Sequence, residues 1–136
     1  MFKRGQISTE YLIVVGFVVF LVLGILGVAF FYTSITSDQI KISQVSSFMN
    51  KIISSAESVF YAGEPSKLTV TGYLPVGVNR LDITSTEIIV GITTSSGVST
   101  MSFSSNVPLI GNISHTEGVK RLEILAQQDE VSITEP

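Results

Sequence analysis

Glu10 is the residue whose position most directly suggests a chemical role. From Tyr11 to Tyr32 the sequence holds no charged side chain, so this carboxylate lies at the edge of a long apolar run. A carboxylate in that position is costly inside lipid or protein unless a positive group pairs with it. The sequence therefore predicts either a charge partner for Glu10 or a simpler role, in which the macrodipole at a helix N-terminus favours the carboxylate.

The remaining reactive residue types form no catalytic or metal-binding pattern. The chain has no cysteine, which excludes a disulfide framework and a thiolate metal site. Its single histidine, His115, lies near Ser114 and Glu117 in a segment that we expect to be a solvated turn. No phosphate-binding glycine motif is present. We therefore expect no enzyme, no metal and no other cofactor, and a membrane-tethered hydrolase has no residue to support it.

The segment Asn112-Ile113-Ser114 is the one candidate for covalent modification. It has the N-x-S pattern of an N-glycosylation site, and we expect it to lie in a domain outside the cell. Short patterns of this kind also arise by chance, so the sequence leaves open whether Asn112 carries a glycan.

Composition bounds the size of the folded part and the class of partner. The chain has 136 residues, and the part outside the apolar run is long enough for one small domain. Charged residues make up 14%, below the roughly 25% usual in soluble proteins. The formal net charge of −3 argues against a nucleic-acid partner, which needs a basic face.

The apolar run from Tyr11 to Tyr32 predicts a membrane-spanning helix. About 20 apolar residues are enough to cross a hydrocarbon core of about 30 Å. A secretory signal has a shorter apolar region, about 7–15 residues, with a small-residue cleavage site after it. Here the small residue that would mark a cut, Gly5, comes before the run. Gly16, Gly24 and Gly27 would let helices approach closely.

The helix is expected to continue well beyond the apolar run. No proline occurs before Pro65, and Gly63 supplies a stop signal, so we predict one helix over roughly residues 7–62. Apolar residues at spacings of three and four predict that one face of its second half packs against the rest of the chain. These helix–head packing residues are Val45, Phe48, Met49, Ile52, Ile53, Ala56, Val59 and Phe60.

After Pro65 the sequence alternates between apolar residues and Ser, Thr or Gly, which is typical of short strands. Ser95-Ser96-Gly97 predicts a hairpin turn. The expected strands are 68–74, 81–83, 87–94, 98–103, 107–113, 119–126 and 131–133. The fold class is therefore α+β: a long N-terminal helix carrying a small antiparallel head resembling a β-sandwich or barrel.

The stretch KRGQISTEY, directly before the apolar run, resembles the class III signal peptide (QxSxEY) of archaeal type IV pilins. The long helix, the β-rich head and the stretch SAESVFYAGEPSKLTV at the helix exit are also similar to that family. In the family a membrane prepilin peptidase cuts after the glycine, on the cytoplasmic side. The resemblance implies a processing site formed by Lys3, Arg4, Gly5 and Gln6, with the cut between the last two.

The resemblance also implies domain boundaries and an assembly mechanism. Residues 1–5 would be a leader, 6–63 a long helix with its hydrophobic part at 11–32, and 64–136 an extracellular head. Gln6 would become the new N-terminus, and Glu10 could neutralise its amine on a neighbouring copy. Gln6, Glu10 and the three glycines of the run are the expected assembly residues.

The function implied is that of a structural subunit of an archaeal surface filament with a role in adhesion. Its expected partners are copies of itself in a helical filament, the prepilin peptidase, an assembly ATPase, a membrane platform protein, and the membrane before assembly. The precursor would lie in the cell membrane and the mature form in the extracellular filament. The alternative is a single-pass membrane-anchored surface protein whose β domain binds a partner.

Overall fold

A computed structural model describes the backbone of residues 3–136 and the side chains from Ser8 onward. The chain divides into two compact units, Met1–Ser37 and Asp38–Pro136. Helix α1 (Lys3–Ala62) supplies all the secondary structure described in the first unit and also begins the second. The sequence predicted this single long helix.

Helix α1 ends where the sequence places its stop signals. Gly63 adopts a positive φ of 79°, a conformation that glycine reaches without the cost of a side chain. Its backbone N–H donates to the carbonyl of Phe60 at 3.1 Å, and its own carbonyl accepts from Ser66 at 2.9 Å. The chain therefore turns at this glycine and enters the first strand.

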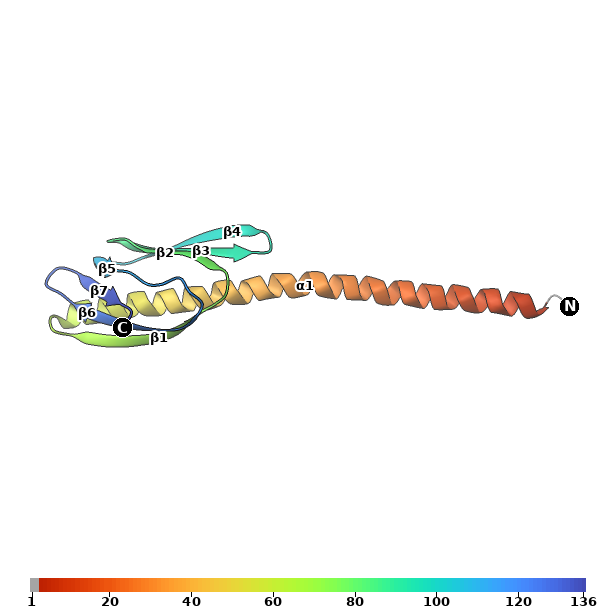
Figure 1. Ribbon diagram of the computed structural model, residues 1–136, viewed down its shortest axis with the longest axis horizontal. Coiled ribbons are helices and arrows are strands. Elements are labelled where there is room, and N and C mark those ends of the chain that lie inside the picture. Colours follow the sequence, from red (N-terminus) through yellow and green to blue (C-terminus); the bar gives the residue numbers. More distant parts are fainter. Residues whose placement is uncertain (1–2) are drawn as a thin grey trace. The chain divides into compact units, whose positions relative to one another are not determined.

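Seven strands follow α1 and form two sheets (Figure 1). They are β1 (Lys67–Leu74), β2 (Val78–Ile83), β3 (Glu87–Thr94), β4 (Gly97–Ser104), β5 (Leu109–Gly111), β6 (Gly118–Ala126) and β7 (Val131–Thr134). One sheet has the order β1-β6-β7-β5 and the other the order β2-β3-β4. Figure 1 shows β1 and the three-stranded sheet along different sides of the C-terminal half of α1.

The α+β class is confirmed, but one strand pair departs from the expected antiparallel arrangement. Strand β5 pairs with β7 in parallel, with Leu109 opposite Val131. The chain between them forms β6, which itself runs antiparallel to β7. The expected strand over 107–113 is reduced to three residues, since Pro108 has no N–H to donate and Gly111 takes a φ of 140°.

The core of the second unit is built around α1. Seven of its side chains belong to one buried cluster together with residues of both sheets. Those seven are Val45, Phe48, Met49, Ile52, Ile53, Ala56 and Val59. Phe60, predicted for the same face, is only partly buried. The helix therefore supplies a layer that each sheet covers from its own side.

Gly72 on β1 lies directly against the Phe48 ring of α1. A Cβ atom at this position would lie 2.0 Å from Cδ2 of the Phe48 ring. No side chain fits there, so the glycine lets the buried ring lie directly on the strand backbone.

Candidate functional site

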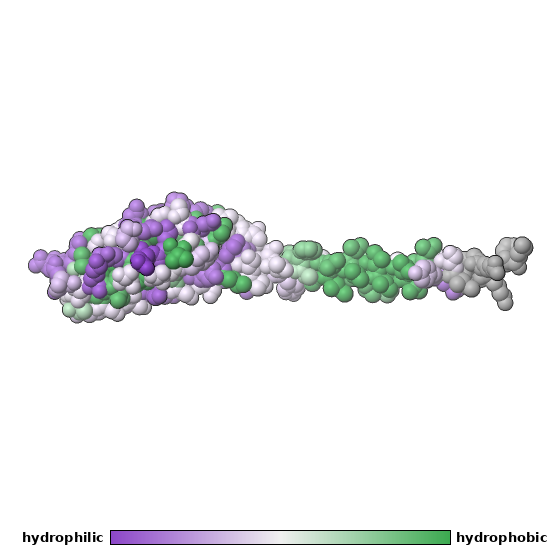
Figure 2. Space-filling model, turned by 60° about the horizontal axis from the view of Figure 1, so that its bottom comes forward, coloured by the Kyte–Doolittle hydropathy of each residue, from purple (hydrophilic) through white to green (hydrophobic). Residues whose placement is uncertain are grey.

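The apolar surface of α1, which we define as residues 11–32, is the most unusual surface in the described part of the chain. Phe20 is 72% exposed and Phe30 is 74% exposed, and their large apolar neighbours in this segment are also exposed. Figure 2 shows apolar residues covering the visible face of this segment. Because consecutive positions are exposed, the apolar character extends around the helix. Such a helix is normally buried in protein or in a membrane.

Length and composition would let this segment cross a membrane. The most apolar stretch of the helix has a mean hydropathy of 3.1, and none of it is buried. About 20 residues of helix match the thickness of a hydrocarbon core. The described residues leave this surface open, and apolar helix surfaces of this kind are normally covered by lipid or by protein.

A hollow of about 320 Å³ interrupts the apolar surface of α1 at Gly24. Phe20 and Leu21 line it about one turn before the glycine and Val28 about one turn after it, and Ile25 follows the glycine directly. A Cβ at Gly24 would meet no atom within 4 Å. A hollow between side chains one turn apart on a helix is the kind of place where an apolar side chain of a neighbouring helix can pack.

Gly16 and Gly27 are two further positions of the same helix at which no side chain covers the backbone. They lie about three turns apart and therefore on one face. A Cβ at either position would also meet nothing within 4 Å. Small residues of this kind allow close helix contacts where no side chain intervenes.

Glu10 lies in α1 with its side chain exposed, one position before the apolar surface begins. The predicted processing residues Lys3, Arg4, Gly5 and Gln6 lie in α1 by their backbone, and their side chains fall outside the described part of the structure. Processing and the amine partner of Glu10 therefore stay predictions.

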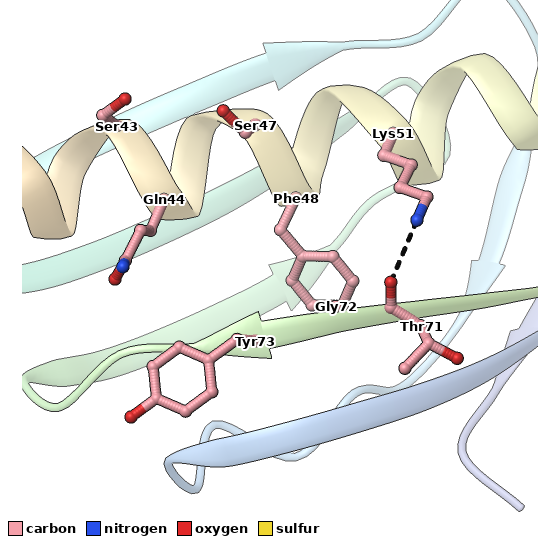
Figure 3. Close-up of a pocket in the computed structure, with 8 residues that line it drawn as sticks. All are labelled: Ser43, Gln44, Ser47, Phe48, Lys51, Thr71, Gly72 and Tyr73. Atoms are coloured by element: carbon pink, nitrogen blue, oxygen red, sulfur yellow. Dashed lines mark hydrogen bonds between the residues drawn. The ribbon is translucent and has the colours of Figure 1, made fainter.

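A groove of about 340 Å³ between α1 and β1 was not predicted from the sequence (Figure 3). Phe48 and Gly72 form its floor, and Tyr73 and Lys51 stand at its sides. The Lys51 ammonium donates to the carbonyl of Thr71 at 3.1 Å. Since the groove arises from the pairing of two elements, no local pattern in the sequence could have revealed it.

The segment that contains Asn112 is irregular and lies after β5. Asn112 and His115 are exposed, whereas Ile113 is buried. The hydroxyl of Ser114 shares a hydrogen bond of 2.8 Å with that of Thr116. The predicted modification site is thus accessible at its asparagine.

Lys120 is a buried cation that holds the C-terminal segment. Only 5% of the residue is exposed, and its ammonium donates to Glu135 Oε1 and Thr116 Oγ1, each at 2.8 Å. The hydrogen bond from Lys120 lowers the pKa of the Glu135 carboxyl, and a backbone N–H from Ser114 lowers it further. Glu135 therefore neutralises a charge that would otherwise be buried without a carboxylate.

Asp38 makes a second long-range contact, to the turn between β3 and β4. Its Oδ2 accepts from the backbone N–H of Ser95 at 2.8 Å and from its hydroxyl at 2.5 Å. These bonds lower the pKa of Asp38. They hold the tip of the β3–β4 hairpin to the helix. Neither this contact nor the Lys120 pair has a signal in the sequence, because each joins distant residues.

No protein-family model, curated protein or solved structure matches this chain. Among the described residues, no group of His, Asp and Glu side chains is arranged to hold a metal ion. The architecture itself is pilin-like: a long apolar N-terminal helix followed by a small β-sheet head.

Proposed function

We propose that the chain is the structural subunit of an archaeal type IV pilus-like surface filament, which polymerises through its N-terminal helix and contributes to surface attachment. The observation that carries this proposal is the exposed apolar surface of α1 on a chain whose β head already buries its core against the C-terminal half of the same helix. In a membrane anchor, lipid would cover the apolar surface of α1 permanently. In a filament subunit, lipid would cover it before assembly and the helices of other copies would cover it afterwards.

Assembly would exchange one apolar environment for another. In the precursor, the apolar surface of α1 lies in the membrane, with Lys3 and Arg4 on the cytoplasmic side as flanking positive charges. Removal of residues 1–5 takes these charges away. The helices then leave lipid and pack on one another, so little apolar surface meets water at any stage. No covalent link between subunits is needed.

Two features of α1 suit it to contacts between copies. The hollow at Gly24 offers a site for one apolar side chain of a neighbour, and Gly16 with Gly27 allows close approach. Van der Waals packing of this kind drives helix association where water is already absent. Glu10 would add charge pairing with the amine of Gln6 on an adjacent copy.

The mass of the mature chain distinguishes this proposal from a single-pass membrane anchor. We expect the chain recovered from cells to lack residues 1–5 and to begin at Gln6. Gly5→Val should remain uncleaved because a bulky β-branched residue replaces the small one at the cut, whereas Gly5→Ala serves as the matched small-residue control. An intact N-terminus on the wild-type chain would favour the anchor, whose β head would then bind a partner at the cell surface.

A further inference from the structure

The two open sheets of the head end in four edge strands: β1 and β5 in one sheet, β2 and β4 in the other. An edge strand presents a row of backbone N–H and C=O groups without strand partners, and another chain can pair with it. Proteins protect such edges with charges, bulges, very short strands or a covering element. The four edges of this head differ in whether they carry such protection.

Three of the four edges are protected. On β1, the Lys51 ammonium from α1 occupies the outward carbonyl of Thr71. Strand β2 has a register shift between Val78 and Arg80, and Arg80 forms an ion pair with Asp82 on the same strand. Strand β5 has only three residues. Pairing of another chain with these edges is therefore hindered.

Strand β4 has none of these protections. Its eight residues, GVSTMSFS, include no charged residue and no proline. It pairs with β3 along its whole length without a register shift, from Thr94 opposite Gly97 to Glu87 opposite Ser104. The bonds from Ser95 to Asp38 also hold the hairpin tip in place. The strand itself is long, regular and uncharged, and the nearest charge is the Glu87 carboxylate on β3, which accepts a hydrogen bond from the Ser102 hydroxyl.

The pairing pattern identifies which backbone groups of β4 point outward. Thr94 and Gly97 enclose a two-residue turn, so they form a hydrogen-bonded pair, and bonded pairs then recur at every second residue. Gly97, Ser99, Met101 and Phe103 bond to β3. The groups of Val98, Thr100, Ser102 and Ser104 therefore form the free edge, and the side chains of these four residues are exposed as well.

We propose that the free edge of β4 pairs antiparallel with β4 of a second copy of this chain. Such a joint needs an unprotected edge on both sides, and β4 is the one long neutral edge that the described head offers. The two β4 strands carry no charge themselves, and the Glu87 carboxylates beside Ser102 belong to β3, one strand further from the partner copy. The register with the most bonds places Thr100 opposite Ser102 of the other copy, and small hydroxyl side chains are compatible partners across such a pair.

The β4–β4 pairing, which we call the joint, has a defined symmetry and a limited strength. An antiparallel self-pairing is two-fold, so it closes on itself and cannot continue along a helical filament. A single strand pair buries less than the roughly 1,200–2,000 Å² of a stable interface, so one joint is weak. If the proposed filament forms, many joints would act together between neighbouring filaments, and their combined strength would bundle them. The pairing of two copies itself does not depend on filament formation.

Disulfide trapping tests this pairing directly, because the wild-type chain contains no cysteine. The full chain in detergent would be prepared as Thr100→Cys and as Ser102→Cys, and the two would be mixed under oxidation. We expect the cross-linked dimer to be the main product. The matched control is a mixture of Thr69→Cys and Thr71→Cys on the protected β1 edge, where the dimer should stay minor. Equal yields from the two mixtures would overturn the proposal.

Variants with opposite charges at residue 100 distinguish pairing between two copies from binding of a different chain. Thr100→Lys should lower self-association of the full chain about tenfold, since the two residue-100 side chains lie diagonally across the joint. Thr100→Glu should do the same, and a mixture of both should restore association. Thr71→Lys on β1 is the matched control and should have no effect. Failure of the Lys and Glu variants to associate with each other, with both folded by circular dichroism, would contradict pairing between two β4 strands.

Discussion

Glu10 and Glu135 are carboxylates with different surroundings, so we expect their charges to have different effects. Glu135 pairs with a buried ammonium inside the head, so its contribution is to the stability of one copy. Glu10 is exposed next to the apolar surface of α1, so any contribution from its charge depends on what covers that surface. Substitutions that remove only the charge separate the two roles.

For Glu135, we predict a loss of stability in acid that the variant Glu135→Gln does not share. The hydrogen bond from Lys120 lowers the pKa of Glu135 in the folded state, so the unfolded chain binds the proton more readily. The stabilisation is fully present above about pH 5 and disappears as the pH falls through the lowered pKa. Melting temperatures of wild type and Glu135→Gln should therefore differ at pH 7 and converge toward pH 3. A constant difference across this range would refute the role of this pair.

For Glu10, we predict that Glu10→Gln is processed but forms few filaments. The substitution keeps the shape and polarity of the side chain and removes the charge that would match the amine of Gln6 on a neighbour. Leaving that amine buried without a carboxylate is destabilising at every subunit added. Electron microscopy would count the filaments, and immunoblots would measure the processed chain in the membrane. Glu10→Asp, which retains the charge, should assemble better. Filaments of ordinary number and length from Glu10→Gln would exclude charge pairing.

At the scale of elements, helix α1 contributes to the molecule in two ways along its length. Its C-terminal half has one buried face, and the contact of Phe48 with Gly72 fixes that face against β1. Its apolar surface has no such contact in the described chain and carries the hollow at Gly24. We therefore expect substitutions in the two halves to affect different measurements.

The Phe48–Gly72 contact should show strong coupling in a double-mutant cycle. Phe48→Ala removes a buried ring and should cost about 3–5 kcal/mol of unfolding free energy. Gly72→Ala should also destabilise the head, because a Cβ 2.0 Å from the ring forces Phe48 to move. With the ring absent, the added methyl group meets no clash. The double variant should therefore lose less unfolding free energy than the two single variants lose together. Chemical denaturation of the three variants would measure this. Strict additivity would contradict the contact.

Substitutions at the hollow beside Gly24 should change filament assembly and leave the stability of the head unchanged. Gly24→Leu fills the hole with a large side chain, so we expect many fewer filaments while the melting of the head stays unchanged. Gly24→Ala adds one methyl group and should have a smaller effect. Filament counts by electron microscopy and thermal melting by circular dichroism would provide the two readouts. Normal assembly of Gly24→Leu would mean that no neighbouring side chain enters this hollow.

Much of the element order could be predicted from the sequence, because the relevant signals are local. The spacing of Val45, Phe48 and Ile52 marks the helix face that the structure buries, and Gly63 marks the helix end. The sheet order has no such signal, and the parallel pairing of β5 with β7 depends on contacts between distant segments. The contact of Asp38 with Ser95 likewise joins residues 57 positions apart.

The candidate site could be predicted only in part, for the same reason. The apolar surface of α1 is visible in the sequence as an uncharged run, and Gly24 stands out within it. The groove beside Phe48 and the free edge of β4 arise from the arrangement of strands around the helix, which the alternation of apolar residues does not specify. Alternation predicts a strand but not its neighbours.

At the scale of the whole molecule, the chain combines a folded head with a helix segment that leaves its apolar side chains exposed. The second unit has 22 buried hydrophobic residues in one cluster, seven of them from the C-terminal half of α1. The apolar surface of α1 has no equivalent cover among the described residues. The proposed assembly into a filament would account for both properties, because the helices would bury one another while the heads face outward and stay available for attachment.

The most direct test of this account is electron microscopy of surface filaments from cells with and without this chain, followed by structure determination of the filaments. We predict that filaments disappear in cells lacking the chain, and that their density shows a core of packed α1 helices beginning at Gln6 with the β heads outside. Filaments that persist without the chain, or a chain found only as an uncleaved membrane protein, would contradict the account.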